Sequence, residues 1–318
     1  MSALLALARP DPAAADAALV ALLDRLAASN YAFVSPTPAT RSLVAGRRTR
    51  ARAGRLTDVL GWSLPFGSGD LPAEVETLLR QGGVLESTGD LQRAAVRVST
   101  VDGRLHLHSA PGADVDAVFL GPDSYRFVRF LDEELRRRPA FGRAVDIGTG
   151  AGVGALALAA RNRDAEVIGT DINPLALRFM RINAAHAGLP VIAAEGRGLA
   201  GQPGPFDLVV ANPPYIADDA GRTYRDGGGD LGTRLAVDWV REAADRLAPG
   251  GRIVLYTGAP VVDGQDRVRA ALSQLADQRG FTLRYDEIDP DVFGGTLRQP
   301  AYRTVDRIAA VGAVLAAP

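Results

Sequence analysis

The chain of 318 residues contains no cysteine, no lysine and only three histidines, and each scarcity excludes a kind of chemistry. Without lysine, it has no P-loop lysine, no Schiff-base lysine and no lysine to which a cofactor could be attached. Without cysteine, it has neither a thiol nucleophile nor a cysteine-ligated zinc site. Because disulfides are rare in the cytoplasm, a chain without cysteine fits a cytoplasmic protein, and that is the predicted location.

Charge and hydropathy narrow the range of partners. The formal net charge is -1, so no overall positive field attracts nucleic acid. No apolar run is long enough to cross a bilayer, which predicts a protein without a membrane span. The one dense basic stretch, residues 47–55, holds five arginines. It is either a contact surface for RNA phosphates or an acidic protein, or a solvated loop, and the sequence leaves both open.

Two domains are predicted: a substrate-recognition domain over residues 1–112 and a catalytic domain over residues 113–318. In the second, apolar strand-like runs alternate with helical patterns. The predicted strands are 144–147, 166–170, 190–193, 206–211 and 252–256, and the predicted helices are 153–161, 174–187, 233–247 and 262–278. This alternation predicts a doubly wound, Rossmann-like α/β fold with helices on both faces of a parallel sheet. Residues 281–288 and 305–314 are expected to add a closing pair of strands.

The first domain has a different pattern. Helices are predicted over 12–28 and 72–81, followed by strands 94–100 and 104–109 on either side of an Asp-Gly turn. Helices followed by a two-stranded ribbon are typical of a small α+β module, such as a winged helix. His106 and His108 stand two residues apart on this hairpin, but without a third ligand nearby no metal site is predicted.

A glycine-dense turn indicates the binding of an adenosine-containing ligand. Residues 145–152 read as a strand that runs into glycines and then a helix, so backbone can approach a ligand closely. Asp171 follows the next strand, where a carboxylate suits a ribose diol. Val153 stands where a dinucleotide fingerprint requires glycine, and Asp146 before the first glycine favours S-adenosylmethionine. Nicotinamide binding and a turn that only packs remain the alternatives.

The segment Asn212-Pro213-Pro214-Tyr215 directly follows a strand-like run and predicts an acceptor site. Each proline removes a backbone donor and fixes φ, so the strand ends there. The Asn212 amide, the carbonyl of Pro213 and the face of Tyr215 can together accept hydrogen bonds from a planar NH2 group and stack against it. Next to a methyl donor, this arrangement predicts methylation of nitrogen. No strong base is required, because the proton leaves after the nitrogen has become cationic.

Three segments, 146–152, 171–174 and 212–216, resemble the class I S-adenosylmethionine-dependent methyltransferases, and in particular the release-factor glutamine N5-methyltransferases. The resemblance spans residues 141–256. It implies a methyltransferase sheet and S-adenosyl-L-methionine as the cofactor. The implied catalytic residues are Asn212, Pro213, Pro214 and Tyr215. The residues implied to contact the cofactor are Asp146, Gly148, Thr149, Gly150, Ala151, Gly152, Asp171, Ile172, Asn173 and Asn212.

The resemblance favours a protein acceptor, such as a translation factor, methylated on a glutamine side-chain amide. The Asn-Pro-Pro-Tyr motif also occurs in enzymes that methylate an exocyclic amine of adenine or guanine, so RNA or DNA is an alternative. A non-catalytic assembly factor that binds the cofactor is a third reading. Where the family carries a Pro-Arg-Pro-Glu-Thr-Glu-like segment, residues 120–127 predict a helix start over the donor pocket. Glu195 is the acidic residue near the third strand, and loop 224–230 is expected to form a pocket wall.

Overall fold

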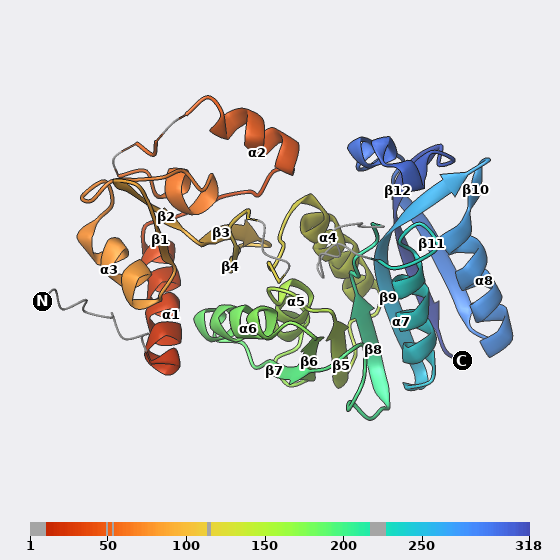
Figure 1. Cartoon of the computed structure of the whole chain (residues 1–318). Helices are drawn as coiled ribbons and strands as arrows, with labels where there is room; N and C mark the ends of the chain where they lie inside the picture. The colour runs from red at the N-terminus through yellow and green to blue at the C-terminus, as the bar shows by residue number, and fades with distance from the viewer. Residues whose placement is uncertain (1–10, 49, 53, 113–115, 217–226) are drawn as a thin grey trace, which may run out of the picture. The chain divides into compact units, whose positions relative to one another are not determined.

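The computed structural model describes residues 11–48, 50–52, 54–112, 116–216 and 227–318 (Figure 1). The chain divides into two compact units. The first ends at Pro111 and also includes Ala185–Gly188, and the second is formed by Gly112–Ala184 and Leu189–Pro318. Over the described ranges, no helix is both long enough and apolar enough to cross a membrane.

The first unit is a small α+β module, as predicted. Its elements are α1 (Pro12–Ala28), α2 (Pro38–Ala45), a one-turn helix (Thr57–Gly61), α3 (Ala73–Gln81), β1 (Leu85–Thr88), β2 (Leu91–Ala94), β3 (Val96–Val101) and β4 (Arg104–Ser109). The predicted hairpin is β3–β4, with Asp102 and Gly103 both in the left-handed region at its turn. A second ribbon, β1–β2, was not predicted, because its four-residue strands are too short for a clear alternation.

The arginine stretch of the first unit is largely paired within the chain. Asp58, only 1% exposed, accepts hydrogen bonds from the side chains of Arg48 and Arg52 at 2.9 Å each. Arg50 donates to Asp70 at 2.6 Å. Thr49 and Ala53 lie outside the described residues. Three of the five arginines of this stretch therefore neutralise carboxylates of their own unit.

The second unit contains the doubly wound sheet that the sequence predicts. Its elements are α4 (Pro122–Arg137), β5 (Arg143–Ile147), α5 (Val153–Arg161), β6 (Glu166–Asp171), α6 (Pro174–Ala187), β7 (Ile192–Glu195), β8 (Phe206–Ala211), α7 (Arg234–Ala244), β9 (Leu247–Val262), β10 (Gln265–Asp266), α8 (Arg267–Arg279), β11 (Thr282–Asp289), two short 3-10 helices (Gly294–Arg298 and Pro300–Tyr302) and β12 (Arg307–Ala316). The strand order is β11-β12-β9-β8-β5-β6-β7. Strands β5 to β9 are mutually parallel, and β12 and β11 close the sheet as an antiparallel pair.

Helices cover both faces of this sheet (Figure 1). Successive residues of a strand point to opposite faces, so they pack against different helices. Alternate residues of the strands, such as Val145 and Ile147 of β5, share one apolar core with residues of α7 and α8. On the opposite face, Phe130 of α4 packs against Gly312 of β12, and Met180 of α6 packs against Gly169 of β6. The sheet is therefore buried on both faces, with one core layer against α7 and α8 and another against α4 and α6.

One helix begins later than predicted. The pattern predicts a helix over 262–278, but β9 continues to Val262 and α8 begins at Arg267. Asp263 and Gly264 both have positive φ and form a tight turn between β9 and β10. The Asp266 side chain then caps α8 by accepting from the Arg269 N–H at 3.0 Å. The apolar residues before the turn belong to strand β9, so the prediction that the helix begins at residue 262 was wrong.

Candidate functional site

The predicted donor and acceptor segments follow the ends of three adjacent strands. Ile147, the last residue of β5, is paired with Thr170 of β6 on one side and with Ala211 of β8 on the other. Neighbouring strands lie about 4.8 Å apart, so Gly148 and Asn212 leave the sheet side by side. The strand order reverses at this point, with β6 and β7 to one side of β5 and β8 and β9 to the other. Such a switch point at the carboxyl ends of parallel strands is where open α/β sheets bind ligands.

The glycines of the turn have different surroundings. Gly148, Gly150 and Gly152 all have positive φ, at +65°, +55° and +82°, which side chains rarely adopt. A Cβ on Gly148 would lie 2.5 Å from the Trp239 ring, and one on Gly152 would lie 2.6 Å from Met180. A Cβ on Gly150 would meet nothing within 4 Å. Gly148 and Gly152 therefore allow close packing of the protein, whereas Gly150 exposes backbone to open space that a ligand can enter.

Asp146 lies beneath the turn and braces it. Its side chain is 2% exposed. Its Oδ2 accepts a hydrogen bond from the Thr149 hydroxyl at 2.7 Å and from the Ala155 N–H, in the first turn of α5, at 2.9 Å. Burial raises the pKa of the Asp146 carboxyl to about 7. This carboxyl thus holds the shape of the turn from below, and it is shielded from solvent.

Thr149 and Ala151, two further residues predicted to contact the cofactor, have buried side chains. Thr149 is 5% exposed, and its N–H donates to the carbonyl of Thr170 at 2.9 Å. Ala151 is 1% exposed, and its carbonyl accepts from the Asn183 side chain at 2.9 Å. These bonds fix the turn to β6 and α6, so the positions of its backbone N–H groups are set before any ligand binds.

Asp171 is the carboxylate that the structure leaves partly exposed next to the turn. Its Oδ2 accepts from the Gly150 N–H and its Oδ1 from the Asn173 N–H, both at 2.9 Å. Burial raises the pKa of the Asp171 carboxyl. The neighbouring Ile172 side chain is 47% exposed, an unusual state for isoleucine. Glu195, the last residue of β7, is paired in register with Asp171 and is exposed.

Asn173 has a structural role at the start of α6. Its side-chain oxygen accepts from the Leu175 N–H at 2.9 Å, which caps the helix. Its side-chain nitrogen donates to the Asp116 carbonyl at 2.7 Å, which fixes the segment before α4. Both polar atoms of this side chain are therefore occupied by protein, and only the backbone of Asn173 is left for the predicted cofactor contact.

The Asn212 side chain is available for an acceptor. It is half-buried, and no described residue forms a hydrogen bond with its amide. The backbone after it is held by a glycine-rich segment: Gly227 donates its N–H to the Ile216 carbonyl at 2.8 Å. Gly232 has φ +88°, and a Cβ there would lie 2.5 Å from the Tyr215 carbonyl oxygen. Of the predicted pocket wall 224–230, residues 224–226 lie outside the described residues. Gly227 packs against the backbone of the motif.

Tyr215 is packed into the protein on most sides. It is 7% exposed, a Cβ on Gly258 would overlap its ring, and the Phe293 ring meets it edge-on at 5.7 Å. Its hydroxyl hydrogen-bonds to the carboxylate of Asp123. Burial and this carboxylate raise the pKa of the Tyr215 phenol well above its ordinary value, so the phenol stays neutral.

Asp123 and Phe293 were not predicted as site residues. The start of α4 at Pro122 was predicted from the sequence, and Asp123 is the next residue. The sequence gives no sign of the contact between Asp123 and the motif. The two lie about 90 residues apart, and only the folded sheet brings them together. A polar residue directly after a helix-starting proline was the only available signal.

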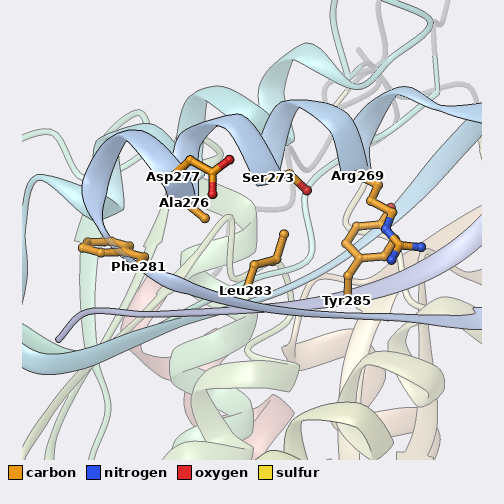
Figure 2. Close-up of a pocket in the computed structure, with 7 residues that line it drawn as sticks. All are labelled: Arg269, Ser273, Ala276, Asp277, Phe281, Leu283 and Tyr285. Atoms are coloured by element: carbon orange, nitrogen blue, oxygen red, sulfur yellow. The ribbon is translucent and has the colours of Figure 1, made fainter.

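A separate hollow of about 300 Å³ lies between α8 and β11, at the edge of the sheet (Figure 2). Its lining residues are Arg269, Ser273, Ala276, Asp277, Phe281, Leu283 and Tyr285. None of the predicted donor or acceptor residues lines it. The candidate site is therefore the edge formed by β5, β6 and β8, and not this hollow.

Comparisons with known proteins agree with the site. The family model described as methyltransferase small domain matches residues 124–282, half of the chain. A release factor glutamine methyltransferase of Bradyrhizobium diazoefficiens is 30% identical over 270 residues, which cover 75% of this chain and 90% of that protein. One of Deinococcus radiodurans is 38% identical over 53% of this chain and 59% of that protein, and one of Rhodospirillum rubrum is 47% identical over 46% and 47%. This chain thus spans about half the length of the last two relatives.

The arrangement of the described residues also fits S-adenosylmethionine. The open backbone at Gly150, the exposed edge of Asp171 and the exposed Ile172 form a polar and apolar border of the kind a nucleoside requires. The Asn212 amide stands one strand away. Together with the family match, these features confirm the predicted resemblance. The chain belongs to the methyltransferase small domain family and is an S-adenosylmethionine-dependent methyltransferase.

Proposed function

We propose that this enzyme methylates the side-chain amide nitrogen of a glutamine in a peptide-chain release factor. The observation that carries the proposal is the register of β5 and β8: Ile147 is paired with Ala211, so Gly148 and Asn212 follow neighbouring strand ends. The Asn212 amide, half-buried and without a hydrogen bond to the described residues, is suited to receive a planar NH2 group. The three relatives described above are named release factor glutamine methyltransferases, which supports a protein glutamine as the acceptor.

The donor side of the site is proposed to hold the cofactor through few exposed groups. Backbone at Gly150, the carboxylate of Asp171 and the side chain of Ile172 would contact it directly. When bound, S-adenosylmethionine supplies a methyl carbon that a nitrogen can attack while the sulfur leaves with the bonding electrons. Asp146, with Thr149, holds the turn in the required shape from beneath.

The acceptor side is proposed to work by orientation. The side-chain oxygen of Asn212 and the carbonyl of Pro213 would each accept one N–H of the glutamine amide. Pro213 and Pro214 fix φ at two successive positions, so these oxygens are held in place before the acceptor arrives. Two hydrogen bonds direct the nitrogen toward the methyl donor and stabilise the positive charge that develops on nitrogen. The amide proton is then released to solvent, and Tyr215 packs on the planar group.

The first unit supports a protein acceptor better than RNA. Its basic stretch is the sequence feature that favours RNA, but Arg48 and Arg52 are paired with Asp58, and Arg50 with Asp70. Fewer charges thus remain for phosphates. All predicted donor and acceptor residues lie in the second unit. We therefore propose that the domain over 1–112 recognises the acceptor protein, which a translation-related enzyme would meet in the cytoplasm.

The test uses purified protein, labelled S-adenosylmethionine, and either a bacterial release factor produced without its methyltransferase or total RNA. We expect label in the release factor, on one glutamine located by peptide mass spectrometry. Asn212→Ala should abolish transfer while S-adenosylhomocysteine still binds in calorimetry. Gln202→Ala, which removes an amide away from the site, is the matched control and should transfer normally. Label that enters RNA and not protein would contradict the proposal.

A further inference from the structure

A buried carboxylate at the start of α4 gathers donors from three parts of the second unit. Asp123 is 4% exposed. Its Oδ1 accepts from the Tyr256 hydroxyl of β9 at 2.9 Å and lies 3.4 Å from the Arg126 guanidinium. The Tyr215 hydroxyl hydrogen-bonds to the same carboxylate. Two phenols and a guanidinium thus converge on one carboxylate, and one of the phenols, Tyr215, lies three residues after Asn212 in the chain.

The ring of Tyr215 is also in contact with Phe293. Phe293 meets this ring edge-on, and Phe293 itself has φ +59°. A bulky side chain in the left-handed region is strained, and such strain persists only where the surroundings dictate the conformation. Arg126 reaches across to Asp289, at the end of β11, at 2.9 Å. The segment that carries Phe293 is therefore tied to the same cluster that holds Tyr215.

The start of α4 contacts the donor side as well. The Asp116 carbonyl accepts from the Asn173 side chain at 2.7 Å, next to Asp171. A Cβ on Gly154 would lie 2.8 Å from the Phe127 ring and equally close to Asp146. The segment from Asp116 to Phe127 therefore contacts residues around the glycine turn on one side and the acceptor motif on the other.

We propose that Asp123 is a positioning residue of the acceptor site, which holds Tyr215 and thereby sets Asn212 and the prolines relative to the glycine turn. The inference deepens the proposed function and rests on it. A purely structural core would be better served by apolar side chains, because a buried carboxylate is costly to desolvate. Burial raises the pKa of the Asp123 carboxyl even though its phenol and guanidinium partners lower it. This unfavourable burial of a carboxylate occurs beside the acceptor motif, whose orientation must be fixed. Its place therefore supports the positioning role that we assign to Asp123.

Asp123→Asn tests the role, because it keeps the shape of the side chain and weakens its hold on the phenols. We expect a roughly 10- to 100-fold loss in kcat/KM for release factor, while S-adenosylhomocysteine binds as tightly as to wild type. Asp123→Glu should restore part of the loss. Asp132→Asn is the matched control, since Asp132 lies on the same helix, is 48% exposed and pairs with Arg136 on the surface.

A double-mutant cycle with Tyr215→Phe separates positioning from general damage. If Asp123 acts through the Tyr215 hydroxyl, adding Asp123→Asn to Tyr215→Phe should lower kcat/KM little further. Full additivity, or an equal loss of transfer and of S-adenosylhomocysteine affinity, would overturn the inference. If Asp123→Asn does not fold, Tyr256→Phe takes its place, because it removes one donor from the cluster and keeps the ring.

Hydrogen exchange supplies a readout that needs no acceptor. Asp123→Asn should speed exchange in peptides that cover 206–216 and leave those that cover 146–152 unchanged. If wild type methylates no release factor but this selective change is seen, the proposed function fails and the hold of Asp123 on the motif stands. If wild type is active and neither exchange nor kcat/KM changes in the folded variant, the positioning role is wrong.

Discussion

Replacing Asp146 with asparagine is expected to change how the stability of the protein depends on pH. Burial raises the pKa of this carboxyl to about 7 in the folded protein, from 3.8 in an exposed chain. Between these pH values the folded state holds more protons than the unfolded state. Each rise of one pH unit in this window therefore lowers the free energy of unfolding by about 1.4 kcal/mol.

The size of the effect follows from the shift. The pKa difference, from 3.8 to about 7, is about 3 units, which corresponds to roughly 4 kcal/mol. An asparagine keeps an oxygen for Thr149 and Ala155 but has no proton to lose. The stability of wild type relative to Asp146→Asn should thus be greatest below about pH 4 and fall by this amount as the pH rises to about 7.

Urea unfolding of both proteins across this pH range is the assay. Asp132→Asn, at the exposed aspartate of α4, is the control for an aspartate-to-asparagine change outside the core. A difference between wild type and Asp146→Asn that stays constant across the range would refute the reasoning. It would mean that Asp146 is ionised in the folded protein and is paired with a charge that the geometry does not contain.

Three further outcomes are expected. Glu134→Ala should lower the free energy of unfolding by about 3–5 kcal/mol in urea melts, because it leaves the buried guanidinium of Arg252 without the carboxylate that lies 3.4 Å away. Gly150→Ala should weaken S-adenosylhomocysteine binding in calorimetry, since its Cβ would enter the open space that a ligand can occupy, and it should also lower the melting temperature, because the φ of +55° strains any residue with a Cβ. His108→Gln should reduce the loss of stability as the pH falls below 6.5, the ordinary histidine pKa: burial, with nearby Arg97 and His106, lowers the His108 pKa, so its neutral form stabilises the fold above that value. Urea melts from pH 7 down to about pH 5 check this last point, and an identical pH dependence in both proteins would contradict it.

The sheet of the second unit is readable from the sequence because its strands are buried on both faces. The run 206–211 becomes β8 with the predicted bounds, and 144–147 lies within β5. Buried parallel strands appear as continuous apolar runs, and prolines or glycines mark where they end. The same residues therefore indicate both the element and the edge at which a ligand would bind.

The finer geometry of the site depends on contacts between distant residues. Nothing near Asp146 in the sequence indicates that its carboxyl turns beneath the glycines toward Ala155, because that direction is set by how α5 packs on β5. The hold of Asp123 on Tyr215 joins α4 to the strand end after β8, and a single sequence carries no record of that pairing. The local sequence thus predicts which chemical groups the site contains. Which of these groups face a ligand depends on how the helices and strands pack.

A crystal structure of the protein with S-adenosylhomocysteine tests the central claim most directly. We expect the sulfur of the ligand between the backbone of Gly150 and the side-chain amide of Asn212, with the ribose on the Asp171 carboxylate. A ligand bound in the hollow between α8 and β11, or an Asn212 amide turned away from the sulfur and bonded within the protein, would contradict it.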